Sequence, residues 1–544
     1  MKTKFFFATM LLACAALMAN AQGYKDGIDF FKIGKYDDAK ELLERNLSTA
    51  SNKAEAYYYL GQVALYQGDK ALAKSYYDKG VQADAKYPFN YVGLAAVELE
   101  NGNLKAAENY YKQAEKCEKK NPKVAIAMAK AYFIVDADKY AKQIEKLTAN
   151  AFKWNPEDPD YYIFQGDMLG VQKQWGAAAG QYDLASQRDP LNIESHVKYT
   201  NVDFFLHPEG ALKSLEELLQ RVPNNALVQR ELAEKYFENR DYENALKYYG
   251  IYYNNPNHFP KDEARYVQLL WLSDNNDKAI EVCDEIIANP AFPAMKFFGY
   301  RYKLYNLCDK KDWDAAANTA TEFFNLADKG GMEYDVRDYS YYANALNNTN
   351  RGAEAIQTFE RAMELFPNEK GIRKQLLGIY NDNKDYVNAA KLCQTIIDSG
   401  DYNETDLYNL ANAYRRIASL ATDDASRQEA VAKARPAVNE LLQKNPNELV
   451  YLYMASQIDV LSENNEVKGN ALNSYMKLIA AVDANPTDEN AAAYYKSAYR
   501  YLGYYFLQSG DNMKAKEYYT KYLQLDPTNE NIRQIVDQLS TLGN

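Results

Sequence analysis

The sequence has few of the residues from which catalytic and metal sites are usually built. It contains only three histidines, His196, His207 and His258, and no two of them lie three or four residues apart. The spacing of a helical zinc site is therefore missing. The motifs G-x-S-x-G, G-x-G-x-x-G and the phosphate-binding P-loop are also absent. We predict no enzymatic activity, no metal site and no cofactor.

The chain also lacks a basic surface and a cysteine framework. Its 63 lysines and arginines are outnumbered by 75 acidic residues, for a net charge of −12. Nucleic-acid binding needs clustered positive charge, so we expect no nucleic-acid partner. None of the five cysteines forms a C-x-x-C pair. We expect Cys283, Cys308 and Cys393 to be small buried side chains, with a disulfide between Cys283 and Cys308 as the alternative.

Long hydrophobic runs are missing except at the start. Two lysines and the apolar run FFFATMLLACAALM precede the tripeptide A-N-A at positions 19–21. This order predicts a secretory signal peptide over residues 1–21, because the run is too short to serve comfortably as a permanent membrane anchor. We expect a periplasmic mature protein that begins at Gln22 and has no transmembrane segment. In the alternative interpretation, LLAC is a lipobox and Cys14 is lipidated.

What the chain does contain is a repeat. The ten-residue stretches GKYDDAKELL, GDKALAKSYY and GNLKAAENYY begin at Gly34, Gly68 and Gly102, which are 34 residues apart. Self-similarity at such a fixed period is the signature of a repeat array. One alanine keeps its place in the pattern and defines fourteen units; it occurs at positions 39, 73, 107, 141, 178, 211, 245, 279, 316, 355, 389, 434, 471 and 515.

Each unit reads as two helices joined by a tight turn. In the second unit, residues 57–64 place apolar and small side chains at i, i+3, i+4 and i+7. Gly68 suits the turn, and the small residues Gly61 and Ala73 allow the two helices to approach closely. Many units end in Asn-Pro or Asp-Pro, which disfavours further helix. A hairpin of this size cannot bury enough surface alone, so neighbouring units must stack.

These residues resemble the tetratricopeptide repeat (TPR). The resemblance covers nearly all of residues 23–527 and implies an all-α fold: a right-handed α-α superhelical solenoid of about fourteen TPR hairpins over residues 22–527, followed by a capping helix and C-terminus over 528–544. Extra residues near 328–336, 418–430 and 462–470 are expected to lengthen loops or helix ends. The clearest match is Tyr501, Leu502, Gly503, Phe506, Gly510, Ala515, Tyr519, Tyr522 and Pro527.

The resemblance implies a non-catalytic scaffold that binds partner proteins or an extended peptide along its concave face. Together with the signal peptide, it resembles the envelope TPR proteins of Gram-negative-type bacteria, some of which assist outer-membrane transport, secretion or energy transduction. In the family, the first helix of each pair lines the concave face. The candidate partner-binding residues at those places are Tyr58, Gln62, Tyr66, Arg230, Glu234, Phe237, Arg301, Tyr305, Tyr408, Asn412, Arg415, Arg416, Arg500 and Tyr504.

We favour the patch over residues 408–416, because two arginines and an asparagine there share one helix face that suits a carboxylate or an extended peptide. The family's clamp for a C-terminal carboxylate is not matched, since Ser340 and Tyr408 stand where lysines are expected. The alternative function is a small-molecule or glycan-binding protein with a tyrosine-rich groove, which the 49 tyrosines would supply.

Overall fold

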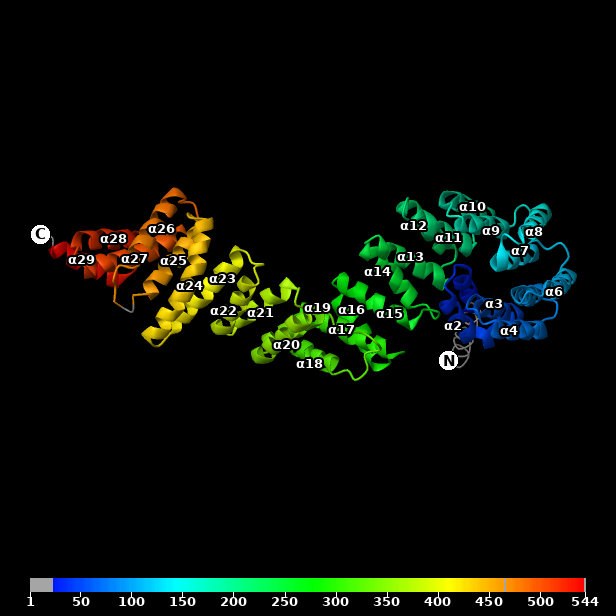
Figure 1. Ribbon diagram of the computed structural model, residues 1–544, viewed down its shortest axis with the longest axis horizontal. Coiled ribbons are helices and arrows are strands. Elements are labelled where there is room, and N and C mark those ends of the chain that lie inside the picture. The colour runs from blue at the N-terminus through cyan, green and yellow to red at the C-terminus, as the bar shows by residue number, and fades with distance from the viewer. Residues whose placement is uncertain (1–22, 464–465, 543–544) are drawn as a thin grey trace, which may run out of the picture. The chain divides into compact units, whose positions relative to one another are not determined.

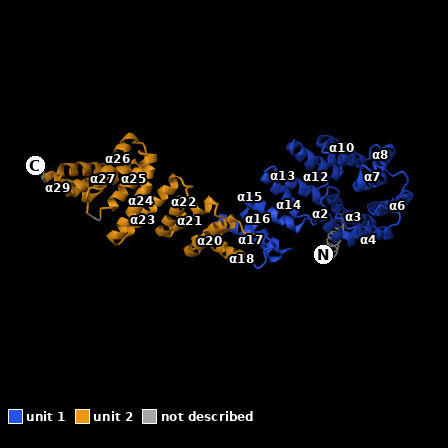
Figure 2. Ribbon diagram, in the orientation of Figure 1, with its two compact units in different colours: residues 1–310, 325–332 blue, residues 311–324, 333–544 orange. Residues whose placement is uncertain are grey.

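The computed structural model describes residues 23–463 and 466–542, which form α-helices, two short 3₁₀ segments and no β-strand (Figure 1). The all-α prediction is confirmed. The predicted signal peptide and Cys14 lie outside the described residues. The chain divides into two compact units (Figure 2): unit 1 comprises residues 1–310 and 325–332, and unit 2 comprises residues 311–324 and 333–544.

Unit 1 begins with a helix over residues 23–32 and continues as a series of helical hairpins. The later helices are α2 (Tyr36–Asn46), α3 (Lys53–Tyr66), α4 (Lys70–Ala83), α5 (Pro88–Glu100), α6 (Leu104–Cys117), α7 (Pro122–Asp136), α8 (Ala141–Trp154), α9 (Pro159–Val171), α10 (Trp175–Arg188), α11 (Ile193–Asp203), α12 (Pro208–Arg221), α13 (Ala226–Glu238), α14 (Tyr242–Tyr253), α15 (Glu263–Leu272), α16 (Asn276–Ala288) and α17 (Pro293–Asp309), with 3₁₀ segments η1 (Leu47–Thr49) and η2 (Pro260–Asp262).

Unit 2 continues the same alternation and ends in a single helix, α29, which packs Ile532 and Leu539 in one apolar cluster with Tyr519 and Tyr522 of α28. Two of the predicted insertions lie in the loops before α19 and after α25, and the third lengthens α23 and α24. The helices are α18 (Trp313–Phe324), α19 (Val336–Asn348), α20 (Gly352–Leu365), α21 (Lys370–Asp382), α22 (Tyr386–Asp398), α23 (Glu404–Leu420), α24 (Asp424–Lys444), α25 (Leu449–Leu461), α26 (Leu472–Ala484), α27 (Ala491–Gln508), α28 (Asn512–Leu525) and α29 (Glu530–Leu542).

The second helix of each hairpin packs through one repeated face. In α4 the buried residues are Ala73, Tyr77 and Gly80, at i, i+4 and i+7. Asp69 caps this helix, accepting a hydrogen bond from the backbone N–H of Leu72 at 2.9 Å. The turn before it needs a left-handed residue, and Gly68 supplies it with φ of +85°. The alanine of the sequence repeat is therefore the first residue of a buried stripe.

One alanine of the series was assigned wrongly. Ala141 lies exposed at the start of α8, whose buried residues are Ile144, Thr148 and Ala151. Ile144 therefore holds the core position that the spacing of the repeat predicts for Ala141. The error arose because counting from Ala107 in steps of 34 residues placed the repeat three residues too early, while the core of the hairpin accepted a larger side chain.

The first hairpin of unit 1 packs against helices far along the chain. The Asn225 side-chain amide at the start of α13 donates to Asp29 at 2.8 Å. The rings of Phe30 and Phe259 meet edge to face at 5.2 Å. The Arg230 guanidinium donates to the Asp38 carboxylate at 2.7 Å. These contacts join the first hairpin to the region of α13–α15, so this part of unit 1 closes on itself.

Candidate functional site

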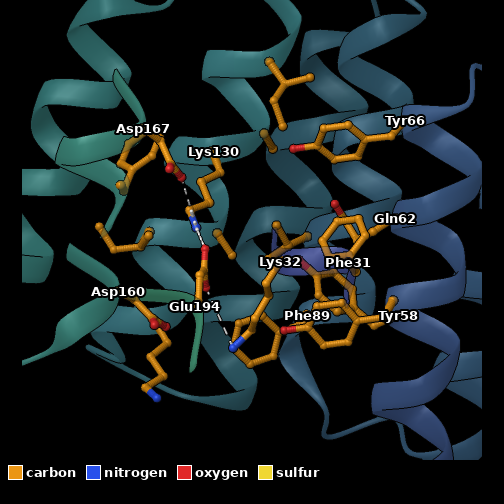
Figure 3. Close-up of a pocket in the computed structure, with 18 of the residues that line it drawn as sticks. Phe31, Lys32, Tyr58, Gln62, Tyr66, Phe89, Lys130, Asp160, Asp167 and Glu194 are labelled. Atoms are coloured by element: carbon orange, nitrogen blue, oxygen red, sulfur yellow. Dashed lines mark ion pairs between the residues drawn. The ribbon is translucent and has the colours of Figure 1, made fainter. Parts of the chain in front are cut away.

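The closed part of unit 1 contains a pocket of about 850 Å³. Its lining comes mainly from the first helices of successive hairpins: residues 29–36, then α3, α5, α7, α9 and α11 with the loop before it. This volume lies within the range of ligand-binding cavities. Figure 3 shows aromatic side chains on one side of the pocket and charged side chains on the other.

The aromatic side is built from paired rings. Phe31 lies 5.6 Å from Tyr66, and Tyr58 lies 5.6 Å from Phe89, between ring centroids. Tyr66 is the more accessible tyrosine, at 41% exposure. Burial raises the pKa of both Tyr58 and Tyr66, so each keeps a neutral hydroxyl that can donate or accept a hydrogen bond. Together with Gln62, these two predicted residues line the pocket.

The charged side is an ion-pair network centred on Glu194 of α11, which is only 5% exposed. The Lys198 ammonium lies 2.8 Å from the Glu194 carboxylate and 2.7 Å from that of Asp167. Lys130 lies 4.0 Å from both acids, and Lys32 lies 3.9 Å from Glu194. Burial acts to raise the pKa of Glu194, but the three lysines together lower it to about 2. Glu194 is thus ionised at neutral pH and is held by its ion pairs with the lysines.

Asp29 gives the pocket a second type of carboxylate. Burial raises its pKa to about 6, against the opposing effects of Lys32 and of the hydrogen bond from Asn225. Because this folded-state pKa lies above the ordinary value, the stability linked to Asp29 is present at acid pH and is lost as the pH rises through about 6. The ionised carboxylate therefore destabilises unit 1 at neutral pH.

The replacement Asp29→Asn should remove this effect. We expect the free energy of unfolding to rise by about 1–2 kcal/mol at about pH 7.5 and to change little near about pH 4, less than the full shift implies because Asp29 is partly exposed. Urea denaturation at the two pH values measures the difference. The exposed Asp138→Asn is the control, with changes within about 0.5 kcal/mol. An equal gain at both pH values in Asp29→Asn would contradict the titration argument.

The patch over residues 408–416, which the sequence favoured, lies in unit 2, and its residues share one face of α23. The guanidinium of Arg415 donates to the side-chain oxygen of Asn412 at 2.7 Å, and Arg416 beside it is exposed. Tyr408 lies on the same helix, with its ring 6.4 Å from that of Tyr451. Burial and the charge of Arg416 lower the pKa of Arg415. Within the described residues, neither arginine forms an ion pair with an acid.

Two candidate residues of the middle helices are engaged with other side chains. Arg230 is 11% exposed and pairs with both Asp38 and Asp262, at 2.7 and 2.8 Å. The ring of Phe237 lies 4.0 Å from the guanidinium of Arg265. Arg230 therefore holds helices together, and the structure does not bring it into the pocket.

The remaining candidates are dispersed. In α17, the guanidinium of Arg301 lies 4.7 Å from the ring of Phe297, and Tyr305 is buried against Trp271 at 5.4 Å. In α27, Arg500 and Tyr504 are exposed, Tyr504 at 43%. The structure thus forms two separate clusters from the candidates, one around Tyr58 and Tyr66 and one around Arg415.

Other side chains give no further site. Cys283 is a buried free thiol, so the alternative disulfide with Cys308 is not formed. Over residues 23–463 and 466–542, no three histidine, cysteine or acidic side chains are grouped to hold a metal ion. Over the same residues, no helix combines the length and hydropathy that crossing a bilayer requires.

Two family models, both described as tetratricopeptide repeat, match the chain. One matches residues 24–88 and 206–258, and the other matches residues 502–529. The matched residues include the first two hairpins, helices α12–α14, and the end of α27 together with α28. No curated protein matches the chain.

Several solved structures are similar to parts of the chain. The C-terminal part of a TPR repeat-containing protein from Cytophaga hutchinsonii is 19% identical, covers 50% of this chain and 99% of its own, and has a TM-score of 0.40. Pseudomonas aeruginosa pilF is 17% identical, with coverages of 42% and 98% and a TM-score of 0.28. Naa15/Naa10 bound to HypK-THB is 12% identical, with coverages of 96% and 96% and a TM-score of 0.27. Because these TM-scores are all below 0.5, the similarity to the tetratricopeptide repeat rests on the residues that match the family models and on the helical hairpins of the structure.

Proposed function

We propose that this chain, whose residues 24–88, 206–258 and 502–529 match tetratricopeptide-repeat models, is a protein-interaction scaffold that acts without catalysis in the cell envelope. Residues 1–21 would direct it to the periplasm, where the mature chain would hold partner proteins along the first helices of its hairpins. The proposal extends to a role as an accessory of an outer-membrane transport, secretion or energy-transduction complex.

The observation that carries this proposal is the cationic patch of α23. Arg415 is half-buried, lies next to Arg416 and has the neutral Asn412 as its hydrogen-bond partner. Within the described residues, these two adjacent guanidinium groups have no acidic partner, although the chain as a whole has a net charge of −12. A carboxylate from a partner would compensate the charge and accept paired N–H bonds. The patch therefore favours a partner that presents an aspartate, a glutamate or a C-terminal carboxylate.

The double replacement of Arg415 and Arg416 by glutamate tests the proposal. A pull-down from envelope extract should recover a stoichiometric partner with the intact chain. Titration of that purified partner should show affinity lowered by about tenfold or more in the double variant, since charged interface anchors contribute strongly. The matched control replaces Arg361 and Arg373, also in unit 2, by glutamate. Equal weakening by both double variants would contradict a specific role for the patch.

Export is tested separately by cell fractionation without detergent. We expect the protein in the periplasmic fraction with an N-terminus at Gln22, as cleavage after a signal peptide would leave it. Recovery only with detergent, together with an acylated Cys14, would assign the lipoprotein alternative instead. Recovery of the protein in the cytoplasmic fraction, with residues 1–21 still attached, would contradict the envelope location.

A further inference from the structure

Aromatic side chains line the pocket of unit 1, and part of their surface faces the cavity. Tyr58 and Tyr66 of α3, with Phe31 and Phe89, form its wall (Figure 3). A ring that faces a cavity can stack on the apolar face of a ligand, while its edge and hydroxyl remain polar. Because Tyr66 is 41% exposed, a ligand can reach its side chain without unpacking the hairpins.

The tyrosine hydroxyls of this wall are also open to a ligand. Among the described residues, no protein group forms a hydrogen bond with the hydroxyl of Tyr36, Tyr58, Tyr59, Tyr66 or Tyr87, although all five tyrosines line the pocket. In contrast, the hydroxyl of Tyr77, outside this lining, accepts a hydrogen bond from Gln62 at 3.0 Å. The pocket therefore presents several donors and acceptors whose hydrogen bonds remain to be made.

The charges of the pocket are largely compensated within the protein. Glu194 lies within 4.0 Å of three lysines, and two of these, Lys130 and Lys198, also pair with Asp167. Glu55 lies 2.6 Å from Lys25, and Glu100 lies 3.1 Å from Lys70. Asp29, Asp160, Asp189 and Lys123 also line the pocket. Counting Lys25 and Lys70, seven acidic side chains face six lysines, which leaves a formal charge of −1.

This compensation disfavours a charged ligand. A charged group that entered the pocket would lose its water and find few unpaired opposite charges. A neutral ligand rich in hydroxyl groups avoids that cost and can still bond to the fixed ammonium and carboxylate groups.

Aromatic faces, unpartnered hydroxyls and a compensated ionic wall suit a molecule that has apolar C–H faces and many hydroxyl groups but no charge. We propose that the pocket of unit 1 binds a neutral oligosaccharide. Tyr66 and Tyr58 stack on or border the sugar rings, and Lys198, Glu194 and Asp167 bond to the hydroxyl groups from the opposite side. This activity is separate from partner binding at Arg415, which lies in unit 2.

The test is a glycan array followed by calorimetric titration with the full mature chain. The array includes neutral glycans, acidic sialylated glycans and a lysine-containing tripeptide, and the titrations use maltotriose, cellotriose and chitotriose. We expect neutral glycans to bind in preference to acidic ones. Tyr66→Ala should weaken the best neutral ligand by about tenfold or more, and Tyr66→Phe, which keeps the ring, should weaken it by about twofold to fivefold.

The control is Phe205→Ala, because Phe205 is an exposed aromatic residue of unit 1, at 83%, that does not line the pocket. Its affinity for the glycan should equal that of the unmodified chain, and circular dichroism should show that each variant remains folded. Three results would overturn the inference: no neutral glycan bound at about 1 mM, stronger binding of the acidic glycans or the tripeptide, or binding that Tyr66→Ala leaves unchanged.

Discussion

Replacing Gly93 with alanine is expected to destabilise unit 1 by about 3 kcal/mol, although alanine normally favours a helix over glycine. A Cβ atom at Gly93 in α5 would lie 2.3 Å from the ring of Tyr77, and one at Gly61 in α3 would lie equally close. Tyr77 is fully buried, so its ring cannot move aside without disturbing both neighbouring helices. The two glycines are thus the places where successive hairpins close on one tyrosine.

Gly180→Ala in α10 is the matched control, because in the described part of the chain no atom outside the helix's own adjacent backbone lies within 4 Å of the added methyl group. The same substitution there should increase the free energy of unfolding by about 0.5–1 kcal/mol. Urea denaturation compares the two variants, and hydrogen exchange should show faster opening of α4 in Gly93→Ala only. A Gly93→Ala protein as stable as the unmodified chain would show that the hairpins have more space than the structure describes.

Replacing Arg230 with methionine should cost about 3–5 kcal/mol, because it leaves two buried carboxylates without their shared partner. The guanidinium lies 2.7 Å from Asp38 and 2.8 Å from Asp262, and so links the first hairpin to α13 and α15. Lys261 also contacts Asp38 but reaches it from a more exposed position. We therefore expect the contact between the first hairpin and α13–α15 to open before the rest of unit 1.

Hydrogen exchange over residues 23–46, measured beside urea denaturation, tests this expectation. Faster exchange there than in α9 and α10 would indicate opening at the closure. Arg361→Met is the control, since Arg361 is 60% exposed and, among the residues that the structure describes, pairs with the exposed Glu364 alone, at 2.7 Å. Its cost should stay below about 0.5 kcal/mol. Uniformly faster exchange throughout unit 1 in Arg230→Met would indicate a general loss of stability without a specific role in closure.

The sequence predicted the hairpins well because their determinants are local. A buried Ala73 followed by Tyr77 at helical spacing, and a glycine at the preceding turn, can be recognised within a few residues. The same local method failed at Ala141, where Ile144 fills the core position. The period of the repeat does not identify the buried residue there, because the packing between helices decides which side chains form the buried face of α8.

The candidate site was predicted only in part. Tyr58 and Tyr66 were placed on the inner face from the family resemblance, and both line the pocket. Glu194 and Lys198 were missed, although their separation of four residues is a recognisable pairing on one helix. Their connection to Asp167 and Lys130 depends on the stacking of three hairpins and has no signal in the spacing of the sequence.

By itself, the sequence determined the helical class, the hairpin unit and the residues that bury each helix against its partner, because these follow from short-range periodicity and turn chemistry. Only the tertiary structure decided that the first hairpin meets α13–α15, that a pocket results, and that Arg230 serves structure there. Small rotations between successive hairpins accumulate over the array. Whether residues almost 200 positions apart come into contact therefore depends on the angles between successive hairpins, which no single repeat specifies.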